Sequence, residues 1–383
     1  MGRILRRILL LVYLITLIPM LGGLLSQWIN PSLAWPLAFF GLLFPLIIMI
    51  QVAFLVTFIL LRSKAVVLPV LFILANWTPI THTFQITWPG QKSSPGANQI
   101  KVMSYNVRLF DFFQWSGQKK AADGIFEYIN ASNPDILCLQ EFMIQDPGKL
   151  PLDRVKTGLS KLPYSYIEYN FTAQARKHGM AIFSRYPILN TGHEHFPETR
   201  NMVIFADLKI GSDTIRVYNN HLESIHFDRD EIELIDDKTD EMRITRDKIG
   251  DIVRRLKGAY IRRASQAIVI NKSIKQSPYR VLVCGDFNDT PVSFTTRKIR
   301  DGLFDSFRSG GNGMSITFPN MKAPLRIDYI LHSKELESSG YEIGRVKFSD
   351  HRPVSTFVKI DGRRTTDDGR KTSVVGHRSS VIN

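Results

Sequence analysis

The sequence predicts an α/β fold, in which mixed β-sheets with flanking helices follow an amino-terminal region of transmembrane helices. Long uncharged apolar runs occupy most of residues 1–88, as membrane-spanning helices require. Beyond residue 98, strand-like runs occur both next to each other and separated by helix-like segments, which is typical of mixed sheets with helices on their faces. Polar residues that could carry chemistry follow directly after several strand-like runs. We therefore expect one catalytic domain at residues 99–361 behind a membrane region.

Three apolar runs in the first 88 residues predict about three transmembrane helices. Residues 8–25 and 33–61 carry no charge, and a spanning helix needs roughly 20 apolar residues. The third run, residues 65–84, is weaker because two prolines and an asparagine interrupt it. A cleaved signal peptide is a poor explanation of the first run, since the second run would still anchor the chain.

Basic residues indicate how these helices cross the membrane. They flank one end of each of the first two runs: Arg3, Arg6, Arg7, Arg62 and Lys64. Residues 26–36 carry no charge, so the positive-inside rule places the charged ends in the cytoplasm. Three spans then put the catalytic domain on the extracytoplasmic side of the plasma (inner) membrane, which is the localisation we expect. If the third run lies only at the membrane interface, the domain stays cytoplasmic.

The charge of the chain is divided unevenly. The 383 residues carry a net charge of +14. Only six of the 49 basic residues precede residue 99, so 43 basic residues accompany all 35 acidic ones after it, a net charge of about +8. This modest excess suits an anionic substrate or a membrane surface but does not by itself indicate DNA binding. Residues 89–98 read as a Gly/Pro/Ser linker, and the basic residues 362–383 as a disordered tail.

Nine strands and three helices are predicted in the catalytic domain. The strand candidates are residues 100–107, 135–140, 180–184, 203–210, 214–219, 280–284, 327–332, 341–348 and 354–360. The helix candidates are residues 119–131, 153–162 and a long charged segment at 240–274. Cys138 and Cys284 lie inside strand candidates and read as buried free thiols; a disulfide is possible only if those strands are neighbours.

Polar side chains at the ends of these strands are the candidates for chemistry. Asn106, Glu141 and His221 each close a strand candidate, where an isolated residue could equally form a turn, lie at the surface or have a structural role. Asp286 follows an apolar run, and a carboxylate there is costly unless it binds a metal, a proton or a partner. Asp328 is flanked on both sides by strand hydrophobes and should be paired with an Arg or a His.

Taken together, these residues provide the groups that phosphoester hydrolysis needs. The carboxylates of Glu141 and Asp350 and the amide of Asn106 are oxygen ligands suited to Mg²⁺, and they accept Mn²⁺ as well. Asp286 is placed to act as a base for the attacking water, and the Asn288 amide could stabilise charge on the phosphoryl oxygens.

Histidines supply the remaining roles. A buried Asp328–His351 pair would raise the pKa of the histidine and fix its tautomer. His221 could then protonate the leaving oxygen.

Seven short motifs in order resemble the endonuclease/exonuclease/phosphatase superfamily, the deoxyribonuclease-I-like group, over roughly residues 99–360. They are Ser104-Tyr105-Asn106, Gln140-Glu141, Gly179-Met180-Ala181-Ile182-Phe183-Ser184-Arg185, Asn220-His221-Leu222, Gly285-Asp286-Phe287-Asn288, Ile327-Asp328-Tyr329 and Ser349-Asp350-His351-Arg352-Pro353. The resemblance implies a four-layered α/β-sandwich with the site at one end of two packed sheets.

The resemblance also implies a role for each candidate residue. Asn106 and Glu141 match the metal-site Asn and Glu of the family, and Asp286 and Asn288 match its water-orienting Asp and phosphate-contacting Asn. Asp328 and His351 match the buried Asp–His pair, Asp350 matches the acidic residue beside that His, and His221 matches a His that some members use near the leaving group.

Two features depart from the soluble members of that superfamily. The charged insertion at residues 228–263 reads most simply as an extended solvated helix, and alternatively as a lid or membrane-facing arm that selects substrate. The amino-terminal spans would place the site beside a lipid surface.

These observations predict a membrane-anchored, divalent-metal-dependent phosphoesterase, nuclease-like, acting on phosphodiester or phosphomonoester bonds. Its partners would be the lipid bilayer and a phosphoester substrate, either nucleic acid or a phospholipid head group. Phospholipid or phosphoinositide hydrolysis is the alternative activity, and a non-catalytic scaffold of the same fold is a further one. No extended aromatic-plus-basic platform for stacking bases is evident in the sequence. A transporter is excluded because the spans contain no internal charge.

Overall fold

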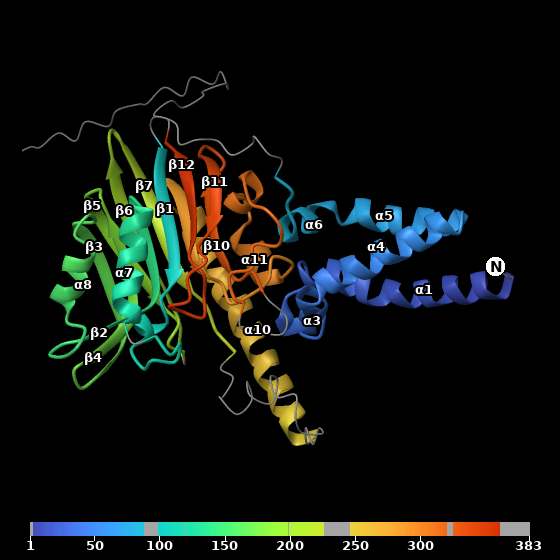
Figure 1. Cartoon of the computed structure of the whole chain (residues 1–383), viewed down its shortest axis with the longest axis horizontal. Coiled ribbons are helices and arrows are strands. Elements are labelled where there is room, and N and C mark those ends of the chain that lie inside the picture. The colour runs from blue at the N-terminus through green and yellow to red at the C-terminus, as the bar shows by residue number, and fades with distance from the viewer. Residues whose placement is uncertain are drawn as a thin grey trace, which may run out of the picture.

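The chain was studied as a computed structural model that describes residues 3–87, 99–118, 120–197, 199–225, 246–319 and 325–360. The predicted linker at 89–98, the predicted tail at 362–383 and residues 228–245 of the charged insertion lie outside these ranges. Figure 1 shows two packed β-sheets with helices on their outer faces, and a group of apolar helices that projects from one side of this domain.

The first sheet has six strands in the order β11-β12-β1-β2-β4-β3. Its strands are β1 Gln99–Asn106, β2 Ile136–Gln145, β3 Tyr164–Ala173, β4 Arg176–Ser184, β11 Glu337–Ile343 and β12 Val354–Lys359. Only the β1–β2 pair is parallel; the other neighbouring pairs of this sheet are antiparallel. Both β1 and β2 therefore end at the same edge of the sheet, where the first candidate residues lie.

The second sheet also has six strands, in the order β5-β6-β7-β8-β10-β9. Its strands are β5 Ile188–His195, β6 Met202–Ile210, β7 Asp213–His221, β8 Arg280–Asp286, β9 Leu303–Asp305 and β10 Asp328–Ser333. Here β7 and β8 form the parallel pair. Their ends meet the ends of β1 and β2 across the sandwich.

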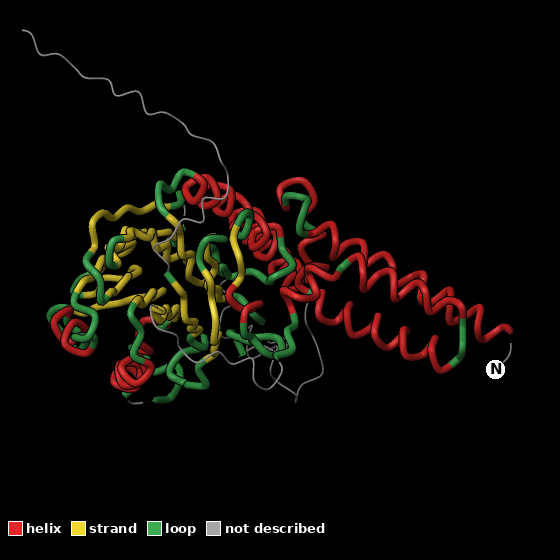
Figure 2. The backbone as a smooth tube through the Cα atoms, turned by 90° about the horizontal axis from the view of Figure 1, so that it is seen from above, coloured by secondary structure: helices red, strands yellow, loops and turns green. Residues whose placement is uncertain are grey.

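Helices cover the outer faces, so that the domain has four layers (Figure 2). Helices α7 (Ala121–Ser132) and α8 (Leu152–Gly158) pack on the first sheet through Ile125, Ile129 and Val155. Helices α10 (Arg246–Lys275) and α11 (Phe294–Ile299) pack on the second sheet. Buried aliphatic side chains fill the space between the sheets, with Cys138 and Cys284 among them as free thiols. The predicted four-layered α/β-sandwich is confirmed.

Some predicted strands differ from those observed. The structure adds β3, β5 and β9, which the sequence analysis did not predict. The candidate at 341–348 overlaps the observed strand β11, Glu337–Ile343, only at residues 341–343. Strand β5 has mostly exposed residues along its length, so it lacks the apolar alternation that marks a half-buried strand. The insertion is helical from Arg246, and α10 continues without interruption to Lys275.

The amino-terminal region contains a short 3₁₀-helix, η1 Lys64–Val66, and six α-helices within residues 3–87. The α-helices are α1 Arg3–Ser26, α2 Pro31–Ala34, α3 Leu37–Leu42, α4 Phe44–Leu60, α5 Val67–Ala75 and α6 Trp77–Thr83. By length and composition, one described helix, Arg6–Ser26, could cross a membrane, or two if the pair Lys64–Ala75 and Trp77–Thr83, bent by 66°, counts as one span. The predicted second run is not one helix, because α2 and α3 precede α4 and prolines occupy the starts of α2 and α4.

This helical region contacts the catalytic domain at the loop that follows Asn288. The Ser26 hydroxyl donates to the Val292 carbonyl at 3.2 Å, and the guanidinium of Arg297 lies 3.2 Å from the ring centroid of Trp28. Gly41 also lies close to this loop, because a Cβ atom there would be 2.1 Å from the Val292 carbonyl oxygen. The helical region also contacts the domain elsewhere, since His82 pairs with Asp305 at 3.3 Å and Ala38 packs with Leu256 and Tyr260 of α10.

Candidate active site

Strand register brings the predicted residues of the second sheet into one row. Asp328 at the start of β10 is paired with Asp286 at the end of β8, and Asp286 is paired with His221 at the end of β7. In the first sheet, Asn106 ends β1 and lies opposite Gln140, the neighbour of Glu141, on β2. These two rows face each other at one end of the sandwich.

The Asn106 side chain joins the two sheets. Its Nδ2 atom donates to Glu141 Oε1 and to Asp286 Oδ2, both at 3.1 Å, and its Oδ1 atom accepts the backbone N–H of Arg108 at 3.1 Å. Asn106 is fully buried, so its amide needs hydrogen-bond partners, and in this orientation both the nitrogen and the oxygen have them. Two carboxylates from different sheets therefore converge on a single amide.

Asn288 and His221 approach the same carboxylates. Asn288 donates its backbone N–H to Asp286 Oδ1 at 2.8 Å, and its Nδ2 atom reaches the Leu222 carbonyl at 2.9 Å and Asp286 Oδ2 at 3.3 Å. The Nε2 atom of His221 lies 3.7 Å from Glu141 Oε1 and 3.9 Å from Asp286 Oδ2. Asp286 is thus the residue that the other groups surround.

His351 connects the two aspartates of the second sheet. Its Nδ1 atom is hydrogen-bonded to Asp328 Oδ2 at 2.9 Å, and its Nε2 atom lies 3.6 Å from Asp286 Oδ2. Burial alone would lower the pKa of His351, but the Asp328 and Asp286 carboxylates raise it well above its usual value. An imidazolium held between two buried carboxylates follows from this geometry.

Burial and the neighbouring charges also shift the pKa values of the carboxylates. Burial, reinforced by Asp328, raises the pKa of Asp286 to about 6, although His351 and His221 act in the opposite direction. Burial, and next the neighbouring Asp350 carboxylate, raises the pKa of Glu141. The carboxylates at this end of the sandwich therefore repel one another when they are ionised.

Asp350 joins the network from the loop before β12. Ser349 donates its hydroxyl to the Asn106 carbonyl at 2.8 Å and lies 3.2 Å from Asp350 Oδ1, while Arg108 Nε lies 3.2 Å from Asp350 Oδ2. All eight residues predicted for the site therefore lie in one connected group. Ser349 and Arg108 were not predicted, since only the folded contacts reveal their part in it.

Unusual backbone conformations support this end of the sandwich. Glu141, with φ of 47°, lies where the β2–β4 register shifts, so a bulge turns its side chain toward the site. Asn288 also has a positive φ, 52°. Gly285 has φ of 132°, and a Cβ atom there would lie 2.1 Å from the Asn220 carbonyl oxygen. Glycine is required at this position so that β8 can approach β7 beside Asp286.

A buried polar network lies directly beneath the site. Gln140 Nε2 donates to Asn219 Oδ1 at 2.6 Å, and Asn219 Nδ2 donates to the carbonyls of Leu139 and Ala181 at 2.9 and 3.0 Å. Gln140 and Asn219 come from different sheets and are fully buried. This network joins the two sheets directly under the candidate residues, and it was not predicted.

Aromatic and arginine side chains gather beside the site. We call Arg108, Phe113, Trp115 and Arg176 the aromatic–arginine cluster. The guanidinium of Arg108 lies 4.9 Å from the Trp115 ring centroid, the Phe113 and Trp115 centroids are 5.0 Å apart, and the Arg176 guanidinium lies 5.7 Å from Phe113. Phe113 and Trp115 are exposed to solvent, at 41% and 38%. Because Arg108 also pairs with Asp350, the cluster adjoins the site directly.

The donor set fits a hard divalent cation. Glu141 and Asp350 have the more accessible carboxylates, with 33% and 19% of their side chains exposed, whereas Asp286 and Asp328 are almost completely buried. Asp286, Asp328 and His351 also present ligand atoms within 4.8 Å of one another. Clustered carboxylates with few cationic partners are stabilised when a cation binds among them, and oxygen ligands suit Mg²⁺ and related ions.

Comparison with known proteins identifies the family. A sequence model described as the Endonuclease/Exonuclease/phosphatase family matches residues 103–351, well over half of the chain, and the chain therefore belongs to this family of phosphoester hydrolases. A second model, a domain of unknown function, matches residues 6–83. The predicted superfamily and the predicted class of reaction, hydrolysis of phosphoester bonds, are confirmed.

Individual relatives are more distant. A DNA-(apurinic or apyrimidinic site) endonuclease of Dictyostelium discoideum is 32% identical over 88 residues, 23% of this chain, so the match spans about a fifth (20%) of that relative. An endonuclease/exonuclease/phosphatase from Beutenbergia cavernae is 16% identical, with 69% of this chain and 72% of that chain covered and a TM-score of 0.49.

Two further solved structures are similar at the same level. TDP2 from C. elegans is 20% identical, with 70% and 77% covered and a TM-score of 0.47. The human Nocturnin catalytic domain is 17% identical, with 70% and 97% covered and a TM-score of 0.48.

Proposed function

We propose that this protein is a membrane-anchored, divalent-metal-dependent phosphodiesterase that acts on nucleic acid. The observation that carries the proposal is the connected group of eight polar residues, drawn from both sheets, around the Asp286 carboxylate. Such a group contains a base, proton donors and oxygen ligands, which together suffice for attack by water on a phosphoester.

Each residue has one role in this proposal. Asp286 orients the attacking water and takes its proton, because its Oδ2 atom lies at the centre of the group, 3.1 Å from Asn106 Nδ2 and 3.9 Å from His221 Nε2. Asn288 and the His351 imidazolium donate to the phosphoryl oxygens, where negative charge develops. Asp328 holds His351 protonated and oriented through the 2.9 Å hydrogen bond.

Glu141 and Asp350 would hold the cation, Mg²⁺ or Mn²⁺, through their carboxylates. Asn106 would join them through its Oδ1 atom once the amide turns from the orientation in which Nδ2 faces both Glu141 and Asp286. When bound, the cation would supply electrostatic stabilisation of the phosphoryl oxygens. His221 would donate a proton to the leaving oxygen, since its Nε2 atom lies 3.7 Å from Glu141 Oε1 and 3.9 Å from Asp286 Oδ2.

The aromatic–arginine cluster favours nucleic acid over a phospholipid head group. Exposed rings next to guanidinium groups can stack on bases and track a phosphate backbone, whereas a head group offers no flat ring to stack on. The Dictyostelium endonuclease acts on DNA by its name, and its short match to this chain agrees with this choice. Hydrolysis of phospholipids remains the second candidate because of the adjacent apolar helices.

Membrane anchoring is supported by where apolar side chains lie. Only 22% of the apolar window in Arg6–Ser26 is buried inside the structure, which argues against a core helix of a soluble protein. Large exposed hydrophobic residues continue along α4 and α5, which project from the domain together with α1 (Figure 1). These helices would lie in the hydrocarbon layer, with the catalytic domain at its surface.

The positions of basic residues favour an extracytoplasmic site. Arg6 and Arg7 lie near Ser63 at one end of the bundle, where these three residues line a single pocket with Ala65. That end is the one away from the catalytic domain (Figure 1). With the basic end in the cytoplasm, the positive-inside rule places the catalytic domain on the opposite side.

A substrate panel tests the proposal. Purified full-length protein with Mg²⁺ should cleave single-stranded and plasmid DNA, lose this activity with a chelator, and release little phosphate or head group from phospholipid vesicles. Preferential turnover of the vesicles would favour the lipid alternative. Absence of metal-dependent turnover on every phosphoester tested would favour the alternative that the protein is a non-catalytic scaffold.

A further inference from the structure

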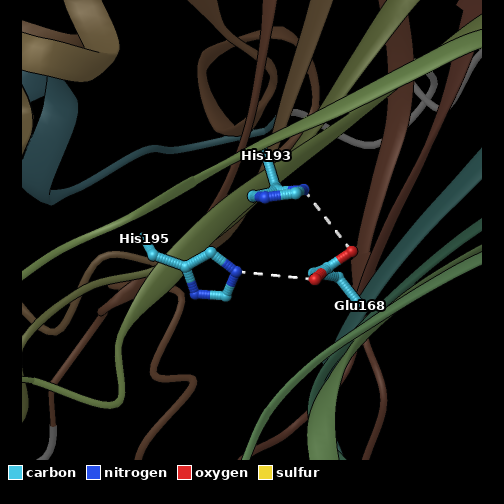
Figure 3. Close-up of side chains that lie close together, drawn as sticks. All are labelled: Glu168, His193 and His195. Carbon is cyan, nitrogen blue, oxygen red and sulfur yellow. Dashed lines mark ion pairs between the residues drawn. The ribbon is translucent and has the colours of Figure 1, made fainter.

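A second group of metal-ligating side chains lies on the other side of the sandwich from β10. It consists of Glu168 on β3 and of His193 and His195 on β5 (Figure 3). We propose that these three residues form a transition-metal site of the Zn²⁺ type, which ties together the edge strands of the two sheets. This site is separate from the proposed oxygen-ligand site around Glu141.

The backbone explains why the three side chains meet. Side chains at i and i+2 of a strand point to the same face, so His193 and His195 both project from one side of β5. Strand β3 is an edge strand of the first sheet and β5 an edge strand of the second. Glu168 extends from β3 toward both imidazoles, as the two dashed lines in Figure 3 show.

The distances are those expected around a metal. His193 Nδ1 lies 3.4 Å from Glu168 Oε2, and His195 Nε2 lies 3.5 Å from Glu168 Oε1. Around a tetrahedral ion with bonds of about 2.1 Å, two ligand atoms lie about 3.4 Å apart. All the ligand atoms fall within 4.8 Å of one another. Small side-chain rotations would therefore complete the site without moving the strands.

The ligand types select the metal. Two imidazoles and one carboxylate are the protein ligands of many zinc sites that keep a fourth position for water, and imidazole prefers Zn²⁺ and similar ions over Mg²⁺. The side chains of His193 and His195 are 45% and 42% exposed, so the fourth position would face solvent and an ion could enter. Mg²⁺ at the catalytic site and Zn²⁺ here would not compete for the same ligands.

A neighbouring side chain already orients the group. The Tyr166 hydroxyl donates to Glu168 Oε2 at 3.0 Å and lies 3.2 Å from His193 Nδ1. Tyr166 packs against the core between the sheets, so its position is fixed. Outer partners of this kind hold ligands in place, and their loss typically weakens metal binding by about 10- to 100-fold.

The site also lies in register with the catalytic residues. His195 pairs with Met202 on β6, and Met202 pairs with His221 on β7. Two strand spacings separate His195 from His221, about 10 Å. A metal at this place would hold the two sheets together at their open edge, near the catalytic end of the sandwich.

Zinc binding by the full-length protein tests this inference. Chelator-treated protein in millimolar Mg²⁺ should bind one Zn²⁺ per chain. The His193→Gln, His195→Gln and Glu168→Gln variants should bind this Zn²⁺ at least about tenfold more weakly, and Tyr166→Phe should weaken its binding to a similar degree. Co²⁺ in the same site should give the visible absorption bands of a tetrahedral ion, and Zn²⁺ should raise the melting temperature of wild type but not of the His193→Gln, His195→Gln and Glu168→Gln variants. These readouts do not depend on enzymatic activity.

Glu194→Gln is the matched control, because it removes one charge from β5 at the position between the two histidines, whose side chain points to the opposite face. It should bind Zn²⁺ as wild type does. Equal Zn²⁺ affinity and equal melting temperatures in wild type and in the folded His193→Gln, His195→Gln and Glu168→Gln variants would overturn the inference, as would weakening by Glu194→Gln to the same extent.

Discussion

The Nδ1 atom of His351 lies 2.9 Å from Asp328 Oδ2, and its Nε2 atom lies 3.6 Å from Asp286 Oδ2. One imidazole thus couples the buried Asp328 carboxylate to the Asp286 carboxylate at the centre of the site. Removal of Asp328 should therefore act through His351. The Asp328→Asn variant should lower kcat by about 10²- to 10⁴-fold, since proton-handling groups typically contribute that much.

A double-mutant comparison checks this coupling. His351→Ala should lower kcat similarly, and the double variant should be little worse than either single one, because both substitutions disable the same pair. Asp213→Asn, which alters an aspartate paired with Arg280 at the other end of β7, should retain activity. Additive losses in the double variant would contradict a shared role. The measurement is steady-state kinetics on bis-p-nitrophenyl phosphate.

Substitution of Glu141 should change how the hydrolytic activity depends on the Mg²⁺ concentration. Glu141→Gln keeps the shape of the side chain and removes the accessible charge that the proposal gives to the cation. We expect a higher Mg²⁺ concentration for half-maximal activity, with part of the activity regained at saturating Mg²⁺. Titration of activity with Mg²⁺ measures this, and an unchanged titration curve would exclude Glu141 as a ligand.

The aromatic–arginine cluster should contribute to binding of nucleic acid and not to the chemical step. Trp115→Ala should weaken binding of single-stranded DNA by about 5- to 150-fold, because stacking of one base on an aromatic ring is worth about 1–3 kcal/mol. Hydrolysis of bis-p-nitrophenyl phosphate should change little. Phe304→Ala, which removes an exposed ring on β9, serves as the control. Equal DNA affinity in both variants would argue against the cluster as a binding surface.

Gly285 should tolerate no larger residue. Gly285→Ala would place a Cβ atom 2.1 Å from the Asn220 carbonyl oxygen at φ of 132°, so the variant should lose at least about 1–3 kcal/mol of stability. Gly250→Ala, on α10 where a Cβ atom meets nothing within 4 Å, should be neutral or stabilise by up to about 1 kcal/mol. Thermal unfolding of the two variants provides the test. If the Gly285→Ala protein were as stable as wild type, β7 and β8 could move apart to accommodate the added Cβ atom, and glycine would not be required at this position.

Much of the site could be predicted from sequence because its residues lie at strand ends next to apolar runs. Asp286 follows a buried run of β8, and Asp328 begins a buried strand. A carboxylate in such a position is unusual, so the sequence alone marks both residues as candidates. Arg108, Ser349 and the Gln140–Asn219 network could not be predicted in the same way. Their contacts arise only when two sheets pack, and residues of their types are common at turns and strand ends.

The fold was predictable where apolar periodicity was strong and not elsewhere. Strand β5 carries His193 and His195 on a mostly exposed segment, so neither the strand nor its proximity to Glu168 can be seen in the sequence. The aromatic–arginine cluster is equally hidden, because it combines the loop after β1 with the start of β4. In residues 3–87, composition predicted apolar helices but not the breaks before α4, which depend on local capping and proline positions.

The most direct test of the central claim is hydrolysis of single-stranded DNA by purified full-length protein, with Mg²⁺ and with a chelator, for wild type and for the folded variant Asp286→Asn. The proposal predicts turnover by wild type that requires the metal and that falls by at least about 10²-fold in Asp286→Asn. Turnover that is unchanged by the chelator, or equal in the two proteins, would contradict it.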